Sequence, residues 1–299
     1  MNKKIRIIGI VIMAVAVVFL VRRFLSFDVD YSELFAAKTL PALALVTIAI
    51  MGTLFMGGFV WNIWLSFFSG KRVSVLATYS VYARSNLAKY LPGNVGQFAM
   101  RQIYGTSLGI RQRELLFSSI LEIFCLAITA LILSLLLARD AFLLYLSDLF
   151  HNAWVLPVII VVIVAVIVFA VVFIRKKKIS ASEILDYLKQ EKFRISLIVV
   201  FGLAACILAV YGTTLLILFG SNANLGAHGL VIVSAGIVSW FVGYVTPGVP
   251  GGIGVREAVL LLMLSPIMAD EVVLFAAVMQ RLAFIFSDVF SWVVGKAIK

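Results

Sequence analysis

Two arginines follow Pro-Gly segments that lie about half a chain apart. The segment PGNVGQFAMR ends at Arg101 and the segment PGVPGGIGVR ends at Arg256, so each arginine comes nine residues after the first proline of its segment. The planar guanidinium group binds phosphate or carboxylate through two parallel hydrogen bonds. Both segments lie in apolar sequence, where inserting an arginine into a membrane costs on the order of 2.5 to 3.5 kcal/mol. We therefore predict that both arginines reach one pocket and bind an anionic group there.

The prolines and glycines of the two segments could contribute to the same pocket. A Pro-Gly break frees backbone N–H and C=O groups, which are costly in lipid unless they are paired. Glycines let successive N–H groups point the same way, and the helix that follows offers a positive dipole end. The candidate anion cradle consists of Pro92, Gly93, Gly96, Pro247, Gly248, Pro250, Gly251, Gly252 and Gly254. The alternative is that these residues only mark kinks at which helices pack.

Four more charged residues fall in or beside apolar segments. Arg281 is a third candidate phosphate ligand, and Asp288 lies two turns further along on about the same helix face. An internal ion pair between them that fixes helix packing is the alternative. Glu122 and Glu257 could pair with the arginines or carry protons for coupled transport, and pairing is favoured. The remaining polar and aromatic residues Arg84, Lys89, Tyr79, Tyr82, Trp61 and Trp64 are expected at the membrane interface.

Composition indicates the solvent that these residues face. Hydrophobic residues make up 63% of the 299 residues and charged residues 13%, and the mean hydropathy is +1.13. Soluble domains carry about a quarter charged residues, so an all-α polytopic membrane protein is predicted. The net charge of +11 comes from short basic runs beside apolar segments and not from a separate basic domain, so nucleic acid is not expected as a partner. The sequence contains no nucleotide-binding motif, catalytic triad or metal-ligand cluster, and no cofactor is expected.

The apolar segments predict about six spanning helices and two re-entrant helical hairpins. The spans are expected at 5–21, 39–68, 114–138, 154–174, 195–219 and 270–295, and the hairpins at 74–110 and 230–266. In each hairpin interval, neither arm is expected to be long enough to cross alone. This arrangement places most loop Lys and Arg residues on one side, as cytoplasmic loops require, with both termini cytoplasmic in the inner membrane.

The two halves of the chain also match one another. Residues 1–150 and 151–299 each contain three spans and one hairpin, and an odd number of crossings inverts the second half. The two Pro-Gly segments are 155 residues apart, close to the offsets between corresponding spans. We therefore predict an inverted repeat, a design that recurs in transporters with broken helices near the midplane.

The sequence around both breaks resembles a known family. NLAKYLPGNVGQ from Asn86, followed by Arg101, and TPGVPGGIGVRE from Thr246, followed by Arg281, resemble the flippase-like membrane region of lysylphosphatidylglycerol synthases, as a stand-alone member without the aminoacyl transferase domain. The resemblance implies movement of phospholipid between leaflets. It points to Asn86, Pro92, Gly93, Arg101, Pro250, Gly251, Gly252, Gly254, Glu257 and Arg281. The chain departs from the family pattern at Gln97, where glutamate is usual, and at Ile123, where arginine is usual.

The leading hypothesis is a translocase for an anionic phospholipid or a polyprenyl-phosphate-linked glycolipid. The lipid headgroup is expected to bind Asn86, Gln97, Arg101, Arg256, Glu257 and Arg281. Glu122 and Asp288 are expected to pair with charged groups or to carry protons. One alternative is a membrane-embedded transferase or phosphatase acting on a lipid-linked substrate. Another is an accessory subunit of cell-envelope lipid assembly. Homo-oligomers or envelope-synthesis enzymes are the expected protein partners.

Overall fold

The computed structural model describes residues 39–91, 95–137, 189–220, 225–246 and 250–298. This part of the chain is all-helical. Its elements are α3 (Leu40–Ser69), α4 (Val75–Asn86), η1 (Leu87–Tyr90), α5 (Gly96–Gly105), η2 (Thr106–Leu108), α6 (Gln112–Leu137), α10 (Glu191–Phe219), α11 (Leu225–Val245), η4 (Pro250–Gly252), α12 (Val255–Leu264) and α13 (Asp270–Ala297).

Helix ends follow local chemistry. A proline in the first turn starts α3, and Gly70 ends it with a left-handed φ of 66°. In α13, Asp270 and Glu271 occupy the first turn and Lys296 the last, so charges at both ends complement the helix dipole. Between such ends the long helices are almost wholly apolar, as a lipid environment requires.

Five helices are long and apolar enough to cross a membrane: α3, α6, α10, α13 and residues His228–Val245 of α11. The helices expected at 39–68, 114–138, 195–219 and 270–295 are thereby confirmed, while those expected at 5–21 and 154–174 lie outside the described residues. The first arm of the hairpin expected at 230–266 was predicted to be too short to cross a membrane, and this prediction was wrong. The helix starts at Leu225 and includes His228, because small residues such as Gly226 and Gly229 do not stop a helix in apolar surroundings.

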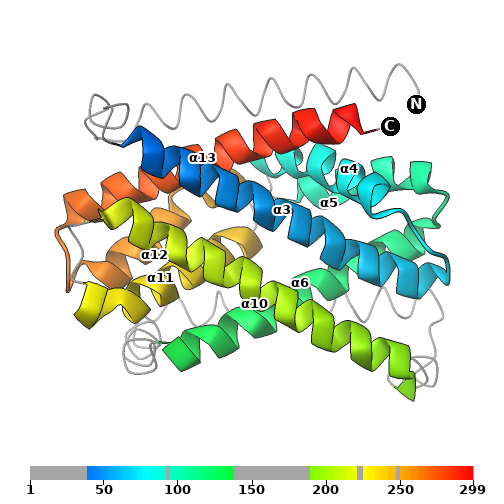
Figure 1. Cartoon of the computed structure of the whole chain (residues 1–299), viewed down its shortest axis with the longest axis horizontal. Coiled ribbons are helices and arrows are strands. Elements are labelled where there is room, and N and C mark those ends of the chain that lie inside the picture. The colour runs from blue at the N-terminus through cyan, green and yellow to red at the C-terminus, as the bar shows by residue number, and fades with distance from the viewer. Residues whose placement is uncertain (1–38, 92–94, 138–188, 221–224, 247–249, 299) are drawn as a thin grey trace.

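The long helices pack around a shared apolar core (Figure 1). α3 contacts α10, α13, α4 and α6, and α10 contacts α11 and α6. Small residues permit the closest approach, since a Cβ atom on Gly236 of α11 would lie 2.8 Å from the Gly212 Cα of α10. The buried cluster of α3, α6, α10, α11 and α13 includes Val46, Trp64, Leu126, Leu208, Ile237 and Ala283.

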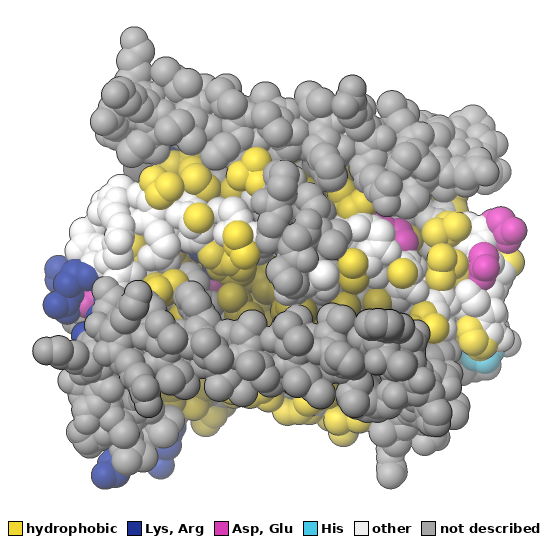
Figure 2. Space-filling view, turned by 180° about the vertical axis from the view of Figure 1, so that it is seen from behind, with side chains coloured by type: hydrophobic (Ala, Val, Ile, Leu, Met, Phe, Trp, Pro, Cys, Tyr) yellow, Lys and Arg dark blue, Asp and Glu magenta, His cyan; other side chains and the backbone are white. Residues whose placement is uncertain are grey.

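Exposed charge separates to the two ends of the bundle (Figure 2). Lys and Arg side chains gather at the end where α3 finishes and α6 and α10 begin; there Lys71, Arg72, Arg111, Arg113, Lys192 and Arg194 are exposed. Asp270 and Glu271 are exposed at the opposite end, where α13 begins. The long helices therefore run between a basic end and an acidic end.

Candidate functional site

The described residues beside the two Pro-Gly breaks meet inside the bundle. Tyr90 ends η1, just before the first break, and a Cβ atom on Gly251 of η4 would lie 2.8 Å from the Tyr90 ring. Leu87, Tyr90 and Ile253 form one buried apolar cluster. Gly251 has a φ of 58°, which strongly favours glycine. The sequence left open whether the breaks meet, and the structure places Tyr90, beside the first, in contact with Gly251 of the second.

The first arginine is neutralised within its own half of the chain. Arg101 Nη1 of α5 lies 2.6 Å from Glu122 Oε2 of α6, and both side chains are 1% exposed. The hydroxyl of Tyr82 donates to Glu122 Oε1 at 2.8 Å, and the Arg101 guanidinium lies 3.8 Å from the centre of the Tyr82 ring. Arg101 and Glu122 therefore form a buried pair. The expectation that Tyr82 anchors the membrane interface was wrong, as it was for Trp61 and Trp64, which are fully buried.

The second Arg–Glu pair joins α12 to α13. Arg281 Nη2 lies 2.6 Å from Glu257 Oε1, and the Arg281 guanidinium also donates to the carbonyl oxygens of Gly251 and Gly252 at 3.4 and 3.3 Å. The other oxygen of Glu257 accepts the N–H of Gly254 at 2.7 Å. The alternative of an ion pair between Arg281 and Asp288 is wrong, because Arg281 pairs with Glu257 and Asp288 with Lys89. Glu257 and the Gly254 amide, both predicted to bind a ligand, are engaged within the protein.

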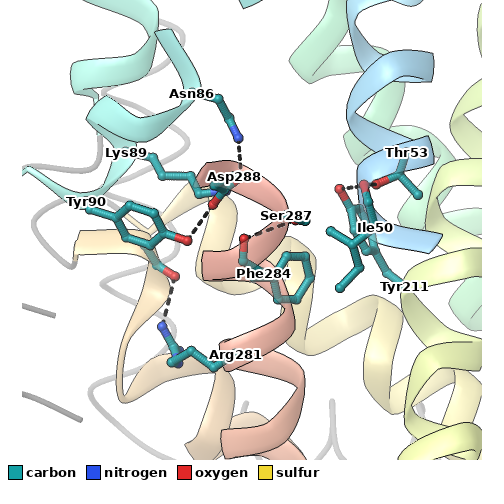
Figure 3. A network of polar contacts seen from close by, with 11 residues as sticks. Ile50, Thr53, Asn86, Lys89, Tyr90, Tyr211, Arg281, Phe284, Ser287 and Asp288 are labelled. Carbon is teal, nitrogen blue, oxygen red and sulfur yellow. Dashed lines mark hydrogen bonds and ion pairs between the residues drawn. The ribbon is translucent and has the colours of Figure 1, made fainter. Parts of the chain in front are cut away.

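Asp288 instead holds the first break against α13 (Figure 3). Its carboxylate accepts the amide of Asn86 at 2.7 Å and the hydroxyl of Tyr90 at 2.5 Å, and Lys89 Nζ lies 2.7 Å away. The interfacial position predicted for Lys89 was wrong, because its side chain is only 12% exposed. The short helix η1 directs the Lys89 side chain inward to Asp288, which lies 199 residues later in the chain. Sequence spacing could not reveal a contact between residues so far apart.

Arg256 has no carboxylate partner among the described residues. Its guanidinium lies 4.9 Å from the centre of the Phe284 ring, and its buried Nε atom has no hydrogen-bond partner. Gln97, at the start of α5, is fully buried, and neither Oε1 nor Nε2 of its amide is hydrogen-bonded. Unpaired buried polar groups are rare in native proteins, so each one needs a physical explanation.

Arg256 and Gln97 line the same internal cavity. About 40 Å³ of it is open to the centre of a water-sized sphere, which is room for a few water molecules. Its wall is built by α3, α4, η1, α5, α6, α10, α11 and α12, through Thr53, Leu54, Gly57, Val60, Tyr82, Asn86, Lys89, Gln97, Glu122, Leu126, Ile207, Tyr211, Trp240, Tyr244 and Arg256. Thus of the predicted site residues, Asn86, Gln97, Glu122 and Arg256 face one cavity.

Aromatic side chains of α10 and α11 form much of the cavity wall. Trp240 is stacked between Tyr211 and Tyr244, with ring centres 4.5 and 5.0 Å apart. The Tyr211 hydroxyl accepts from Thr53 of α3 at 3.0 Å (Figure 3). Their position was not predictable, because aromatic residues on apolar helices are as consistent with the lipid interface as with an internal wall.

The glycines mainly allow close packing. Gly96 packs so closely against the Ala88 carbonyl that a Cβ atom would overlap it, and Gly252, with a φ of 72°, lies against the backbone of Gly243. Pro92, Gly93, Pro247 and Gly248 lie outside the described residues, as does the side chain of Pro250. Among the described glycines, close packing is therefore the role with direct structural support.

Comparison with known proteins decides the family. A family model described as the lysylphosphatidylglycerol synthase TM region matches residues 6–288. The chain belongs to this family. The match covers nearly the whole chain, so almost all of these residues belong to the transmembrane region that defines the family. It is a multi-pass integral membrane protein of a family linked to lipid modification or translocation. No curated protein and no solved structure matches it significantly.

Proposed function

We propose that this family member is a lipid translocase that moves an anionic phospholipid or a polyprenyl-phosphate-linked glycolipid between leaflets. The observation that carries the proposal is the cavity beside the two breaks, which helices from both halves of the chain line and into which the polar side chains of Gln97 and Arg256 face. A headgroup passes through this cavity while its acyl chains stay in the bilayer. Because the cavity is smaller than a headgroup, passage requires the lining helices to separate.

The path of the chain supports two re-entrant hairpins. In Figure 1, α4 begins and α5 ends toward the basic end of the bundle, whereas α11 begins and α12 ends at the acidic end. Each half also has an Arg–Glu pair that joins the helix after its break to the following long helix, α5 to α6 and α12 to α13. Both features fit an inverted repeat whose halves rock against each other. The basic end is assigned to the cytoplasm, with both termini on that side.

The engaged state of the two glutamates favours transport over catalysis. A general base needs a free carboxylate within reach of substrate. Glu122 already accepts from Arg101 and Tyr82, and Glu257 accepts from Arg281 and the Gly254 amide. We therefore assign these two carboxylates to structure and not to a transferase or phosphatase reaction.

The test is transfer of fluorescent anionic lipids in vesicles that contain the purified protein. A bleaching agent added outside reports how much lipid reaches the outer leaflet. Ile207→Trp should slow transfer strongly, because Ile207 lines the cavity, whereas Ile198→Trp on the lipid-facing side of α10 should not. Equal rates for both variants, or no transfer of any lipid tested, would refute the proposal. Mass spectrometry of the same lipids tests the enzymatic alternative, which requires a change in mass.

A further inference from the structure

The charges around the two breaks do not balance. The described residues that line the cavity or pair beside the breaks include four cations, Lys89, Arg101, Arg256 and Arg281, and three carboxylates, Glu122, Glu257 and Asp288. Lys89 and Arg256 are partly buried, and the other five are buried. Each carboxylate forms an ion pair with one cation, and Arg256 is the cation left over. The local surplus is therefore one positive charge, and it faces the cavity.

The residues beside this charge leave hydrogen-bonding capacity for a ligand. Gln97 lines the cavity with both amide atoms unpaired, and the Nε of Arg256 is buried without a partner. A buried polar atom without a partner costs about 1 to 3 kcal/mol. Two such side chains on one cavity therefore indicate a bound group that forms the missing hydrogen bonds. The group must accept hydrogen bonds from a guanidinium and from an amide N–H.

We propose that this cavity binds one phosphodiester group of a lipid through Arg256 and Gln97. The inference rests on the proposed function and names its substrate class. The Arg256 guanidinium donates to the non-bridging phosphate oxygens, and Gln97 Nε2 donates to the same group. The Oε1 atom of Gln97 accepts from a hydroxyl or ammonium group elsewhere on the headgroup.

Charge balance determines which phosphates are accepted. A phosphodiester carries one negative charge, which equals the surplus at Arg256. A diphosphate carries at least two, and the excess would remain unpaired in surroundings of low dielectric, where such a charge is costly. The other cations cannot neutralise it without leaving their carboxylates. Phosphodiester lipids, including polyprenyl-monophosphate sugars, are therefore substrates, whereas diphosphate-linked lipids are excluded.

Binding to the purified full-length protein in detergent tests this inference separately from transport. The probes are dihexanoylphosphatidylglycerol, farnesyl diphosphate and inorganic phosphate, with native mass spectrometry and thermal stabilisation as readouts. We expect the phosphodiester lipid to bind roughly ten-fold or more tightly than either other probe. Binding of farnesyl diphosphate or inorganic phosphate as tight as that of the diester would overturn the proposal.

Three variants locate the site. Arg256→Gln removes the surplus charge, and Gln97→Glu adds a carboxylate of the same shape to the cavity, so each should weaken the diester roughly ten-fold or more. Arg113→Gln removes an exposed arginine outside the cavity and should bind like the wild type. Thermal melts of the ligand-free variants show whether they are folded. If folded Gln97→Glu binds the diester normally, the proposal is wrong.

The two proposals can fail independently. Diester binding that depends on Arg256, in a protein that moves no lipid in vesicles, would refute translocation and leave the binding site intact. Lipid transfer without preference between diester and diphosphate, and unaffected by Gln97→Glu, would refute the binding site and leave translocation intact.

Discussion

Lys89 and Asp288 form a buried ion pair, with 2.7 Å between Lys89 Nζ and Asp288 Oδ2, that joins η1 to α13. The same carboxylate accepts from Asn86 and Tyr90, so three side chains beside the first break depend on one residue of the last helix. The contact connects the two halves of the chain.

Asp288→Asn should destabilise the protein by about 3 to 5 kcal/mol, since it leaves Lys89 buried without a counter-charge. Thermal or denaturant unfolding in detergent measures the effect. Asp270→Asn is the matched control on the same helix, because Asp270 is exposed, and its effect should be much smaller. Similar stability of both variants would contradict the role assigned to Asp288.

Glu122→Gln should cost about 3 to 5 kcal/mol, because Arg101 then stays charged and buried without its partner. The double variant Arg101→Met with Glu122→Gln removes both charges and should recover part of that loss. A double-mutant cycle on unfolding free energies measures the coupling between the two side chains. A double variant less stable than the sum of its single changes would argue against the pair.

Gly251→Ala should lower stability and weaken the contact between the breaks. The added Cβ atom would lie 2.8 Å from the Tyr90 ring, at a φ of 58° that L-residues rarely adopt, and we expect a cost of about 1 to 3 kcal/mol. Gly202→Ala, where the Cβ atom meets nothing within 4 Å, should be neutral or stabilising by up to about 1 kcal/mol. Comparison of melting temperatures would reveal the difference, and equal values would contradict it.

A disulfide between α4 and α13 should stop transfer. A Cβ atom on Gly295 would lie 3.0 Å from the Ala83 Cβ, close enough for a disulfide after a small shift. Ala83→Cys with Gly295→Cys, in a chain with Cys125 and Cys206 replaced by alanine, should cross-link on mild oxidation. Lipid transfer should then fall and return with reductant, while Ala83→Cys alone should not respond. Unchanged transfer in the cross-linked protein would show that α4 and α13 need not separate.

The sequence predicted the positions of the long helices better than the contacts of the charged side chains. Continuous apolar runs were enough to locate α3, α6, α10 and α13, because only helices of such length satisfy their backbone in lipid. It did not reveal the full length of α11, whose first turns contain glycine and histidine and resemble a loop. Local composition cannot show that packing will keep such a turn helical.

The sequence also predicted equivalent roles for Arg101 and Arg256, because each lies nine residues after a proline. The structure separates them. Arg101 meets Glu122 on α6, whereas Arg256 lies against Phe284 with no carboxylate in reach among the described residues. The difference arises from helix packing between distant segments, and a repeat in sequence does not require a repeat in partners.

Arg281 and Asp288 are seven residues apart on α13, two helical turns or about 10.5 Å along its axis. One contacts the second break and the other contacts the first. Rotation or sliding of α13 would therefore release both at once, so that the two breaks behave as one cooperative unit. Substitutions at the two positions should then be non-additive even though their side chains do not touch.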